Sequence, residues 1–496
     1  MRKSGYIIWA AAVIALVLVC LGGCADGEEN LSGTVYADSY EMDLHLDTDQ
    51  KTLSGTADIH FTNHTDGKLE RVIVRNYPAS ILKELKNGSA EISTVTAEDG
   101  TPLSFSVEKD PSVVTVKLGG QSLSPDQSAV IRVSYKTDIP QVRDRFGVYI
   151  EGENEYYLLT FCFPMLSVFE DGKWNDSPYV FGGESTYSKV CDYNVRFEAP
   201  EDFLVAASGN ETTKAGVTEI KAENMRDMSI IASNNMEVQT DTAAGIRINN
   251  YTFRHPGYDW MDTYNELTME SAKESVEMFT ELFGEYPYEE LDVIQCADDG
   301  GMEYPGLILI GLPDVDPRKG LMKGMEIQGA GPNLCLLVAH ETAHQWFYAA
   351  VGNDQYQEPW LDESFANYCE NGIYGLAYPP ALKRAIEIQE AASGQEVYLL
   401  WGSEEEVEKC LPQEPDKINK PYEEYADDYG WIVYEQGAQF FFELRKAMGD
   451  DQFFSMMREY YKTYCLKEAA GKDFIDLIYK YDDSEKVDSI IARYIA

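Results

Sequence analysis

The first half of the chain shows a repeated alternation of apolar and polar residues with a period of two. Met42, Leu44 and Leu46 alternate with polar neighbours, and Ile59 and Phe61 do the same after a turn-like segment. Because successive side chains of a strand point to opposite faces, this pattern predicts a hairpin with one dry face. Similar stretches, separated by Gly, Pro, Asn and Asp, recur to about residue 240. We therefore predict an N-terminal antiparallel β-sandwich domain over residues 34–245.

The pattern changes after residue 245. A predicted strand at residues 246–253 precedes an amphipathic helix at residues 260–282, which Gly284 and Pro287 would end. Two further apolar stretches, at residues 291–296 and 307–311, are typical of buried strands. From there on, helical patterns dominate, at residues 334–350, 363–372, 432–448, 451–464 and 474–479. The chain is thus predicted to be multidomain, β and then α+β, with residues 246–496 forming the second domain.

Residues 1–24 differ in composition from the rest. Arg2 and Lys3 are followed by no charged residue before Asp26, and residues 7–21 are almost wholly apolar, which is typical of an export signal. The segment ends in LGGC, which resembles a bacterial lipobox, so we expect a lipoprotein signal peptide, a diacylglyceryl group on Cys24 and a tether at residues 25–33. The alternative is a single uncleaved transmembrane anchor. Both place the body of the protein outside the cytoplasm, on the cell membrane.

Charge and cysteine content narrow the function classes. The chain has 85 acidic and 40 basic residues, a formal charge of −45, which repels phosphate backbones and argues against nucleic acid as a partner. Of nine cysteines, seven remain beyond Cys20 and Cys24, and no two of them form a C-x-x-C pair. A cysteine-based zinc site is therefore not expected, and we predict mostly buried free thiols.

A metal site is predicted from the sequence HETAH at residues 340–344. His340 and His344 are four residues apart, so on a helix both imidazoles share one face and can bind the same ion. Glu341 lies beside them, where it can take a proton from a water at the metal. The apolar flanks make this helix buried, and two imidazoles without partners would be costly there. A zinc ion is therefore favoured over the alternative, a pair of hydrogen-bonded core histidines.

A hydrolytic zinc site needs a third protein ligand and one open position. Glu363, in the segment WLDESFANY, follows His344 after eighteen intervening residues, and Gly352 and Asn353 between them could end the first helix. Glu363 would then project from an antiparallel helix towards the histidines. Glu370 lies two helical turns further on the same face and could orient a ligand from behind; a solvated carboxylate is the alternative.

Together these segments resemble the aminopeptidase N family of gluzincin zinc metallopeptidases. The HETAH motif, the eighteen-residue spacing and WLDESFANY carry the resemblance, supported by GGMEY at residues 300–304 and VYEQGA at residues 433–438. The opening YEMDLHLDTDQKTLSGTADIHFTNHT is also similar to the first β-hairpin of that family. The resemblance covers roughly residues 35–480. It implies a thermolysin-like zinc peptidase domain after the β-domain, with one zinc ion per chain.

The resemblance also implies roles for individual residues. His340, His344 and Glu363 would bind zinc, and Glu341 would act as general base and then general acid. Tyr434 would donate a hydrogen bond to the oxyanion, with Tyr429 as the fallback. In the substrate-binding segment, Glu303 would bind the free amine of a peptide, while the backbone of residues 301–304, which begins with Gly301 and Met302, would pair with the substrate as an added strand.

Three departures from the family pattern affect the expected specificity. Tyr304 stands where the family has Asn and is followed by Pro305, and residues 160–165 replace the family's second amine-binding segment. We also expect the large C-terminal helical domain of longer members to be lacking, which would leave the site more open. We expect a membrane-tethered, extracytoplasmic zinc metallopeptidase that removes N-terminal residues from peptides. The alternatives are a zinc endopeptidase or other amide hydrolase, and a binding lipoprotein with a vestigial site.

Overall fold

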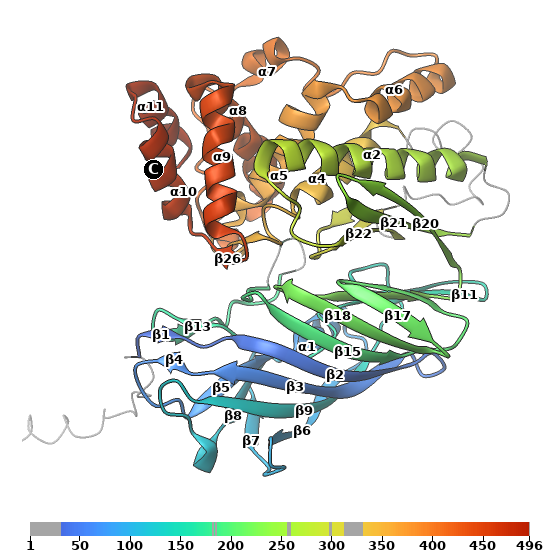
Figure 1. The fold of residues 1–496 in the computed structure, drawn as a ribbon, viewed down its shortest axis with the longest axis vertical. Helices are drawn as coiled ribbons and strands as arrows, with labels where there is room; N and C mark the ends of the chain where they lie inside the picture. Colours follow the sequence, from blue (N-terminus) through green and yellow to red (C-terminus); the bar gives the residue numbers. More distant parts are fainter. Residues whose placement is uncertain are drawn as a thin grey trace, which may run out of the picture.

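The computed structural model describes residues 31–180, 183, 186–254, 259–296, 300–311 and 331–495. The predicted signal segment, its Cys24 and most of the tether lie outside the described residues. Within these ranges the chain forms two parts that lie one above the other, a lower part of β-sheets and an upper part rich in helices (Figure 1). No helix among the described residues is both long enough and apolar enough to span a membrane.

The largest sheet of the N-terminal part has seven strands in the order β17-β18-β15-β2-β3-β9-β6. Their bounds are β2 Ala37–Asp47, β3 Thr52–Thr62, β6 Ala90–Ala97, β9 Ser128–Asp138, β15 Cys191–Glu198, β17 Asn210–Lys214 and β18 Val217–Met225. β2 and β3 pair antiparallel with Met42 opposite Ala57, so the predicted hairpin is confirmed. One pair departs from the antiparallel pattern, because β15 returns to the sheet alongside β2 and runs parallel to it.

Two four-stranded sheets complete this part. One has the order β12-β5-β8-β7 and the other β10-β11-β19-β16. Their bounds are β5 Arg71–Arg75, β7 Ser104–Val107, β8 Val113–Lys117, β10 Phe146–Glu151, β11 Asn154–Thr160, β12 Met165–Leu166, β16 Leu204–Ala207 and β19 Ser229–Ser233, with helix α1 at Tyr77–Leu85. Short strand pairs, β1 Gly33–Thr34 with β4 His64–Thr65 and β13 Phe169–Glu170 with β14 Lys173–Trp174, lie at the periphery. The sheets bury their apolar faces in one hydrophobic core.

The upper part contains a five-stranded sheet in the order β20-β21-β22-β24-β23. Its strands are β20 Met236–Ala243, β21 Ile246–Phe253, β22 Glu290–Cys296, β23 Gly301–Met302 and β24 Leu307–Gly311. The domain boundary predicted at residue 245 falls in the turn between β20 and β21. Strand β20 lies before this boundary, but it belongs to the sheet of the upper part. The short β23 is the edge strand and pairs antiparallel with β24.

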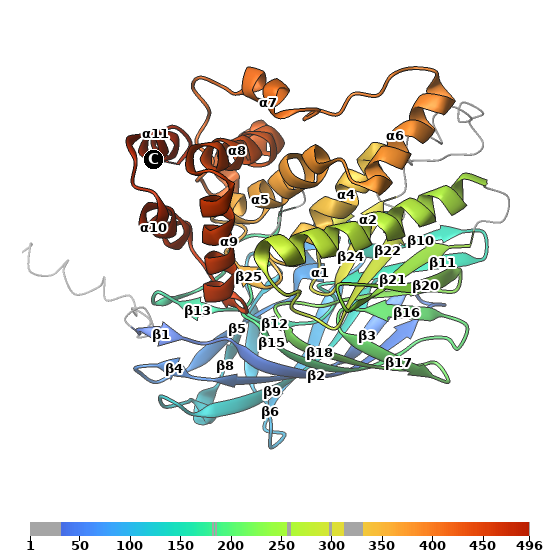
Figure 2. The ribbon, with the colours of Figure 1, turned by 45° about the horizontal axis from the view of Figure 1, so that its top comes forward.

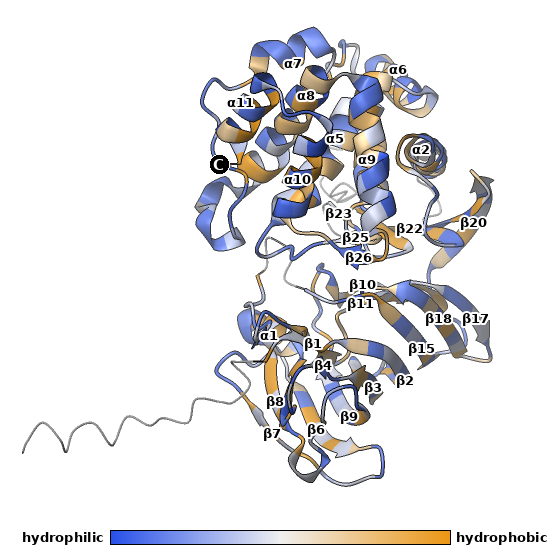
Figure 3. Cartoon of the chain, turned by 60° about the vertical axis from the view of Figure 1, so that its left-hand side comes forward, coloured by the Kyte–Doolittle hydropathy of each residue, from blue (hydrophilic) through white to orange (hydrophobic). Residues whose placement is uncertain are grey.

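Helices pack on one face of this sheet, and the β-part lies on the other side (Figure 2). They are α2 Asp259–Phe283, α4 Pro332–Ala343, α5 Glu363–Tyr368, α6 Pro380–Ser393, α7 Glu404–Cys410, α8 Gly437–Met448, α9 Asp450–Tyr464, α10 Gly471–Tyr481 and α11 Glu485–Tyr494. π-helical turns extend α5 as η5 at Cys369–Gly375 and precede α8 as η8 at Gly430–Gln436. The outer helices show polar outward faces and apolar inward faces (Figure 3). Helices α6, α7 and α11 were not among the predicted elements.

The helix predicted at residues 334–350 is wrong in its second half. Helix α4 ends at Ala343, and the chain then turns into the short strand β25, Val351–Gly352, which pairs parallel with β26, Lys467–Glu468. Tyr348 in this turn has a φ of 128°, which no helix accommodates. The expectation that Gly352 and Asn353 end the helix is therefore also wrong, because the strand pairing takes over before them.

The cysteines within the described residues are free, as predicted. Five of them are buried, Cys410 is exposed and Cys465 is half-buried. Burial raises the pKa of the Cys162 and Cys191 thiols to about 12, which keeps them protonated and unreactive. These residues act as small core side chains.

Candidate metal centre and active site

Helix α4 is buried on almost every side and carries the HETAH motif at its end. His340 and Glu341 lie in its last turn, and His344 is the first residue after it. Apolar residues of α4 pack within the hydrophobic core of the upper part, and α2, α5, α6 and η5 contact the helix. The predicted α-helical spacing is therefore kept up to His344, which is what brings both imidazoles to one side.

The two histidines and Glu363 converge on one point. The His340 Nε2 to His344 Nε2 distance is 3.2 Å, and Glu363 Oε2 lies 3.4 Å from the first and 3.3 Å from the second. A tetrahedral zinc site with ligand bonds of about 2.0–2.1 Å places neighbouring ligand atoms about 3.3 Å apart. All three side chains are buried. The donor set and its spacing therefore fit a zinc ion.

Two further observations favour a cation at this point. Glu363 Oε2 is buried and has no hydrogen-bond partner within the described chain, although it faces two imidazoles. Burial alone would raise the pKa of the Glu363 carboxyl, but the two imidazoles that face it outweigh burial and hold that pKa well below its usual range. A carboxylate kept ionised in a closed site is the state that metal binding requires.

Each histidine is held in its orientation by a contact at Nδ1, the ring nitrogen that faces away from the metal site. Glu370 Oε2 lies 3.1 Å from His340 Nδ1, and the carbonyl oxygen of Phe347 lies 3.1 Å from His344 Nδ1. These contacts favour the tautomers with protonated Nδ1, which leaves each Nε2 lone pair for a metal. The predicted position of Glu370 behind a ligand is thus what the structure shows, on η5 instead of a continuous α-helix.

Glu341 lies beside the three ligands without joining them. Its Oε2 is buried and has no hydrogen-bond partner in the described structure. Burial raises the pKa of the Glu341 carboxyl to about 7, against the opposing effect of the two histidines. The backbone of β23 passes so close that a Cβ on Gly301 would lie 2.0 Å from Glu341 Oε1. Glycine at this position therefore leaves room for the carboxylate that the resemblance assigns as general base.

Tyr434 reaches the site from η8. Its hydroxyl donates to Glu363 Oε1 at 2.6 Å, and its ring stacks on His340 with the centroids 5.9 Å apart. Asn367 Nδ2 donates to the Tyr434 carbonyl at 2.9 Å and so fixes this turn of the backbone. The fallback residue, Tyr429, contacts the Tyr434 ring at 6.0 Å and does not line the cavity of the site. The geometry therefore favours Tyr434 for the predicted oxyanion role.

Glu303 follows the edge strand β23 and is 5% exposed. Its carboxylate, that of Glu341 and a ring nitrogen of His344 each place an atom within 4.8 Å of the others. Gln355 Nε2 donates to Glu303 Oε1 over 3.4 Å. A solvated surface glutamate is thus excluded, and a buried carboxylate stands beside the reacting groups, as an amine-binding role requires.

A cavity of about 380 Å³ connects these groups. Its lining residues are Arg145, Gly183, Gly301, Met302, Glu303, Leu337, His340, Glu341, His344, Glu363, Asn367, Glu370 and Tyr434. The sequence analysis did not identify four of these lining residues, Arg145, Gly183, Leu337 and Asn367. Asn367 could have been predicted from the sequence, because it lies one helical turn after Glu363. Arg145 belongs to the β-part, and no sequence pattern connects it with the metal ligands.

The segment that replaces the family's second amine-binding motif packs as core. Phe161, Cys162 and Phe163 are buried, and the Phe161 ring contacts Tyr304 at 6.1 Å. None of residues 160–165 lines the cavity. This segment therefore supplies no group that could bind a substrate amine in the cavity, as the sequence predicted. Among the described residues, Glu303 is the acidic side chain placed to bind that amine.

Sequence comparisons agree with this site. Residues 267–494 match the family model described as Peptidase family M1 domain. Aminopeptidase N of Lactobacillus delbrueckii subsp. lactis is 24% identical over 465 residues, which cover 90% of this chain and 49% of that protein. Aminopeptidase O of Homo sapiens is 25% identical over 226 residues, 41% of this chain and 26% of that protein. The chain spans about half or less of the length of the curated relatives first matched.

The fold is shared over nearly the whole described chain. A crystal structure of an M1 zinc metallopeptidase from Deinococcus radiodurans superposes with a TM-score of 0.60 at 17% identity, covering 94% of each chain. The chain is similar to aminopeptidase N-like gluzincins: a β-rich part is followed by residues that match the M1 peptidase domain. This similarity and the buried His-His-Glu group together support a zinc-dependent peptidase.

Proposed function

We propose that this protein is a zinc aminopeptidase that removes N-terminal residues from peptides. The observation that carries the proposal is the buried Glu303 carboxylate beside Glu341 and the metal ligands. An α-amine paired with this carboxylate would set the first peptide bond over the metal ligands. A mutant form of the Deinococcus radiodurans metallopeptidase, which shares the fold with a TM-score of 0.59, has been solved bound to a Tyr-Ser-Ala substrate.

The roles of the chain's own residues follow from their contacts. The two histidines and Glu363 would hold the zinc ion, which would polarise the carbonyl as a Lewis acid and lower the pKa of the attacking water. Glu341 takes the proton of that water and delivers it to the leaving amine. Tyr434 turns its hydroxyl from Glu363 to the oxyanion. A substrate that pairs with β23 as an added strand would cover the cavity and keep bulk water out of it.

The test compares free and N-acetylated forms of one peptide. Acetylation removes the cationic amine, so we expect wild-type kcat/KM to fall by roughly 10²-fold or more, the scale of a lost charge-assisted hydrogen bond. Glu303→Ala should lower cleavage of the free peptide and leave the blocked peptide nearly unchanged. Glu405→Gln, an exposed charge loss on α7, is the matched control. Equal cleavage of both peptides by the wild type would replace the proposal with an endopeptidase.

The endopeptidase is retained as the second candidate because of a specific observation. Residues 160–165 are packed away from the cavity, so amine recognition depends on fewer groups than the family pattern provides. Arg145 lines the same cavity and could contact a backbone carbonyl of a longer substrate. Internal cleavage of an N-acetylated peptide would favour this candidate.

We further propose an extracytoplasmic position, with the protein held on the cell membrane by a lipid on Cys24. The support is the sequence of residues 1–24, which lie outside the described residues. Cys24→Ser should release the protein from the membrane fraction and abolish its labelling by a fatty acid. A single transmembrane anchor would instead keep the variant membrane-bound.

A further inference from the structure

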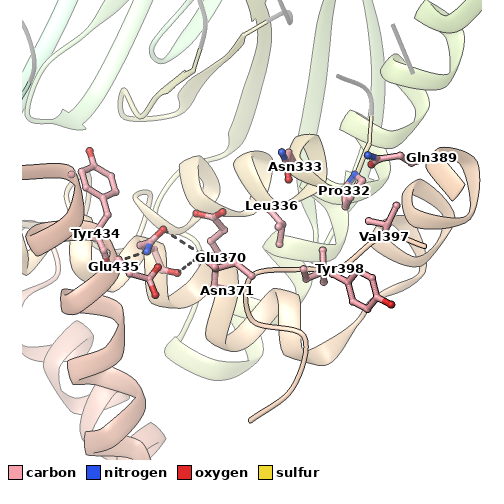
Figure 4. Close-up of a pocket in the computed structure, with 14 residues that line it drawn as sticks. Pro332, Asn333, Leu336, Glu370, Asn371, Gln389, Val397, Tyr398, Tyr434 and Glu435 are labelled. Carbon is pink, nitrogen blue, oxygen red and sulfur yellow. Dashed lines mark hydrogen bonds between the residues drawn. The ribbon is translucent and has the colours of Figure 1, made fainter. Parts of the chain in front are cut away.

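A second cavity, of about 570 Å³, adjoins the active site, and Figure 4 shows the residues that line it. It shares Asn367, Glu370 and Tyr434 with the cavity around the metal ligands. Glu303, Gly301 and His344 line only the first cavity. The second cavity therefore begins on the side of Tyr434 and Glu370, away from the carboxylate proposed to hold the substrate amine. A peptide anchored at Glu303 would direct its later residues there.

The walls of this second cavity combine apolar, amide and acidic groups. Leu336 and Val397 supply apolar surface, Asn371 and Gln389 supply amides, and Glu435 supplies a second carboxylate beside Glu370. No Lys, Arg or His lines it among the described residues. The connection between α6 and α7 supplies the outer wall, where Tyr398 is 78% and Leu400 73% exposed. Large apolar side chains exposed to this degree at a cavity edge are available to contact a ligand.

Glu435 is fixed in position at this wall. Its Oε1 accepts hydrogen bonds from Trp401 Nε1 at 3.1 Å and from Gln439 Nε2 at 2.9 Å. Burial raises the pKa of the Glu435 carboxyl, and the negative charge of Glu370 adds to that rise. Two carboxylates therefore repel each other across a cavity whose described lining carries no cation, and a cationic ligand group would relieve this repulsion.

We propose that this cavity binds the part of the peptide that follows the cleaved bond, and that Glu435 selects a basic side chain there. The proposal rests on the proposed aminopeptidase function and names its substrate class: peptides with Lys or Arg at the second or third position. Glu435 directly follows Tyr434 and lines the second cavity but not the first, so we infer that it meets a side chain shortly after the cleaved bond, at the second or third position.

The experiment compares peptides that carry Lys, norleucine or Glu at the second or at the third position, after the same first residue. We expect kcat/KM with Lys to exceed that with norleucine by roughly three- to tenfold at one of these positions, the scale of one partly buried ion pair, and Glu to be the poorest. Glu435→Gln keeps an acceptor for Trp401 and Gln439, so it should remove this preference without loss of the fold. Glu405→Gln is the charge-matched control and should keep it.

Two readouts separate the possible failures. Hydrolysis of an aminoacyl anilide, which has no residue after the scissile bond, should be equal in wild type and Glu435→Gln; a parallel loss would make Glu435 a structural residue and overturn the inference. Peptide affinity for the zinc-loaded Glu341→Gln protein, measured by calorimetry, needs no turnover and should show the same Lys preference. Cleavage without any preference overturns the inference alone. Absence of all peptide and anilide cleavage overturns the proposed function, while the affinities still decide on the subsite.

Discussion

Four buried or half-buried carboxylates surround the two imidazoles, and their contacts separate their roles. Glu363 meets both Nε2 atoms, whereas Glu370 contacts an Nδ1 atom from behind. Glu341 has a buried oxygen without a partner in the described structure, and Glu303 lies beside it at the end of an edge strand. Each position thus follows from a different backbone element, so single substitutions can test them separately.

Glu341→Gln should abolish turnover and leave metal binding intact. The substitution removes proton transfer, which typically contributes about 10²–10⁴-fold, and leaves the three ligands unchanged. The measurement is kcat on a dipeptide substrate together with the zinc content of the purified variant. Wild-type kcat in a zinc-loaded variant would show that Glu341 is not the base.

Tyr434→Phe should lower kcat/KM by about 10²–10³-fold, because one donor to the oxyanion is lost. The ring stacked on His340 remains, and the hydrogen bond from Asn367 goes to the backbone, so the fold should persist. Circular dichroism and zinc content provide the control. Unchanged kinetics would remove Tyr434 from the reaction and require Tyr429 to be tested in its place.

At the scale of elements, the site depends on where α4 stops. The turn after it presents the Phe347 carbonyl to His344, and Tyr348 follows with its φ of 128°. The Tyr348 hydroxyl donates to Asp227, which belongs to the β-part and is buried. Arg226, next to it, donates to the Ala349 carbonyl at 3.3 Å. The β-part therefore holds the turn that orients one metal ligand.

Tyr348→Phe should destabilise the protein and loosen the metal. Loss of the donor leaves a buried carboxylate poorly satisfied, which costs about 1–3 kcal/mol, and disturbed support of a ligand typically weakens metal affinity by about tenfold. The thermal midpoint and a competitive zinc titration measure the two effects. Tyr479→Phe, which removes an exposed hydroxyl bonded to Asp488, is the matched control and should change neither quantity appreciably. Equal behaviour of the two variants would contradict the proposed support.

Local patterns predicted most of these elements, and tertiary contacts decided the rest. The helix at α2 and the β2–β3 hairpin follow from the period of their apolar residues, and the metal ligands follow from the spacing of HETAH and Glu363. The end of α4 could not be predicted, because Trp346 and Phe347 continue the buried apolar pattern while β26 provides the competing partner. The parallel pairing of β2 with β15 could not be predicted either. The alternation of apolar and polar residues shows which face of a strand is buried, but it does not show which strand lies alongside.

At the scale of the whole molecule, a cluster of carboxylates joins the two parts. Glu211, on β17, accepts from the Tyr251 hydroxyl on β21 at 2.8 Å. On β22, Glu290 and Asp292 both accept from Asn249, at 3.0 and 2.9 Å. Among the described residues, Arg247 is the cation that faces the cluster. Its Nε donates to Glu290 at 2.7 Å and its Nη2 to Asn210 at 3.3 Å. Three carboxylates therefore share one guanidinium.

This imbalance makes the stability depend on pH. Burial raises the pKa of the Glu211 carboxyl to about 7 and that of Asp292 well above its usual value, with the neighbouring carboxylates adding to both rises. In the unfolded chain such groups titrate near pH 4. Between these values the folded protein binds more protons than the unfolded chain, so the free energy of unfolding falls as pH rises. At about 1.4 kcal/mol per unit of pKa shift, we expect a loss on the order of 2 kcal/mol between pH 5 and pH 8.

Asp292→Asn should remove much of this dependence. Asn resembles the protonated acid, still accepts from Asn249, and leaves Arg247 with fewer charges to balance. The measurement is the thermal midpoint of the zinc-loaded protein from pH 5 to pH 8, with Glu405→Gln as an exposed control for the change of net charge. We expect wild type and control to lose stability in parallel as pH rises, while Asp292→Asn loses less and becomes the more stable protein at pH 8. Parallel curves for all three proteins would show that the cluster does not link protonation to the contact between the two parts.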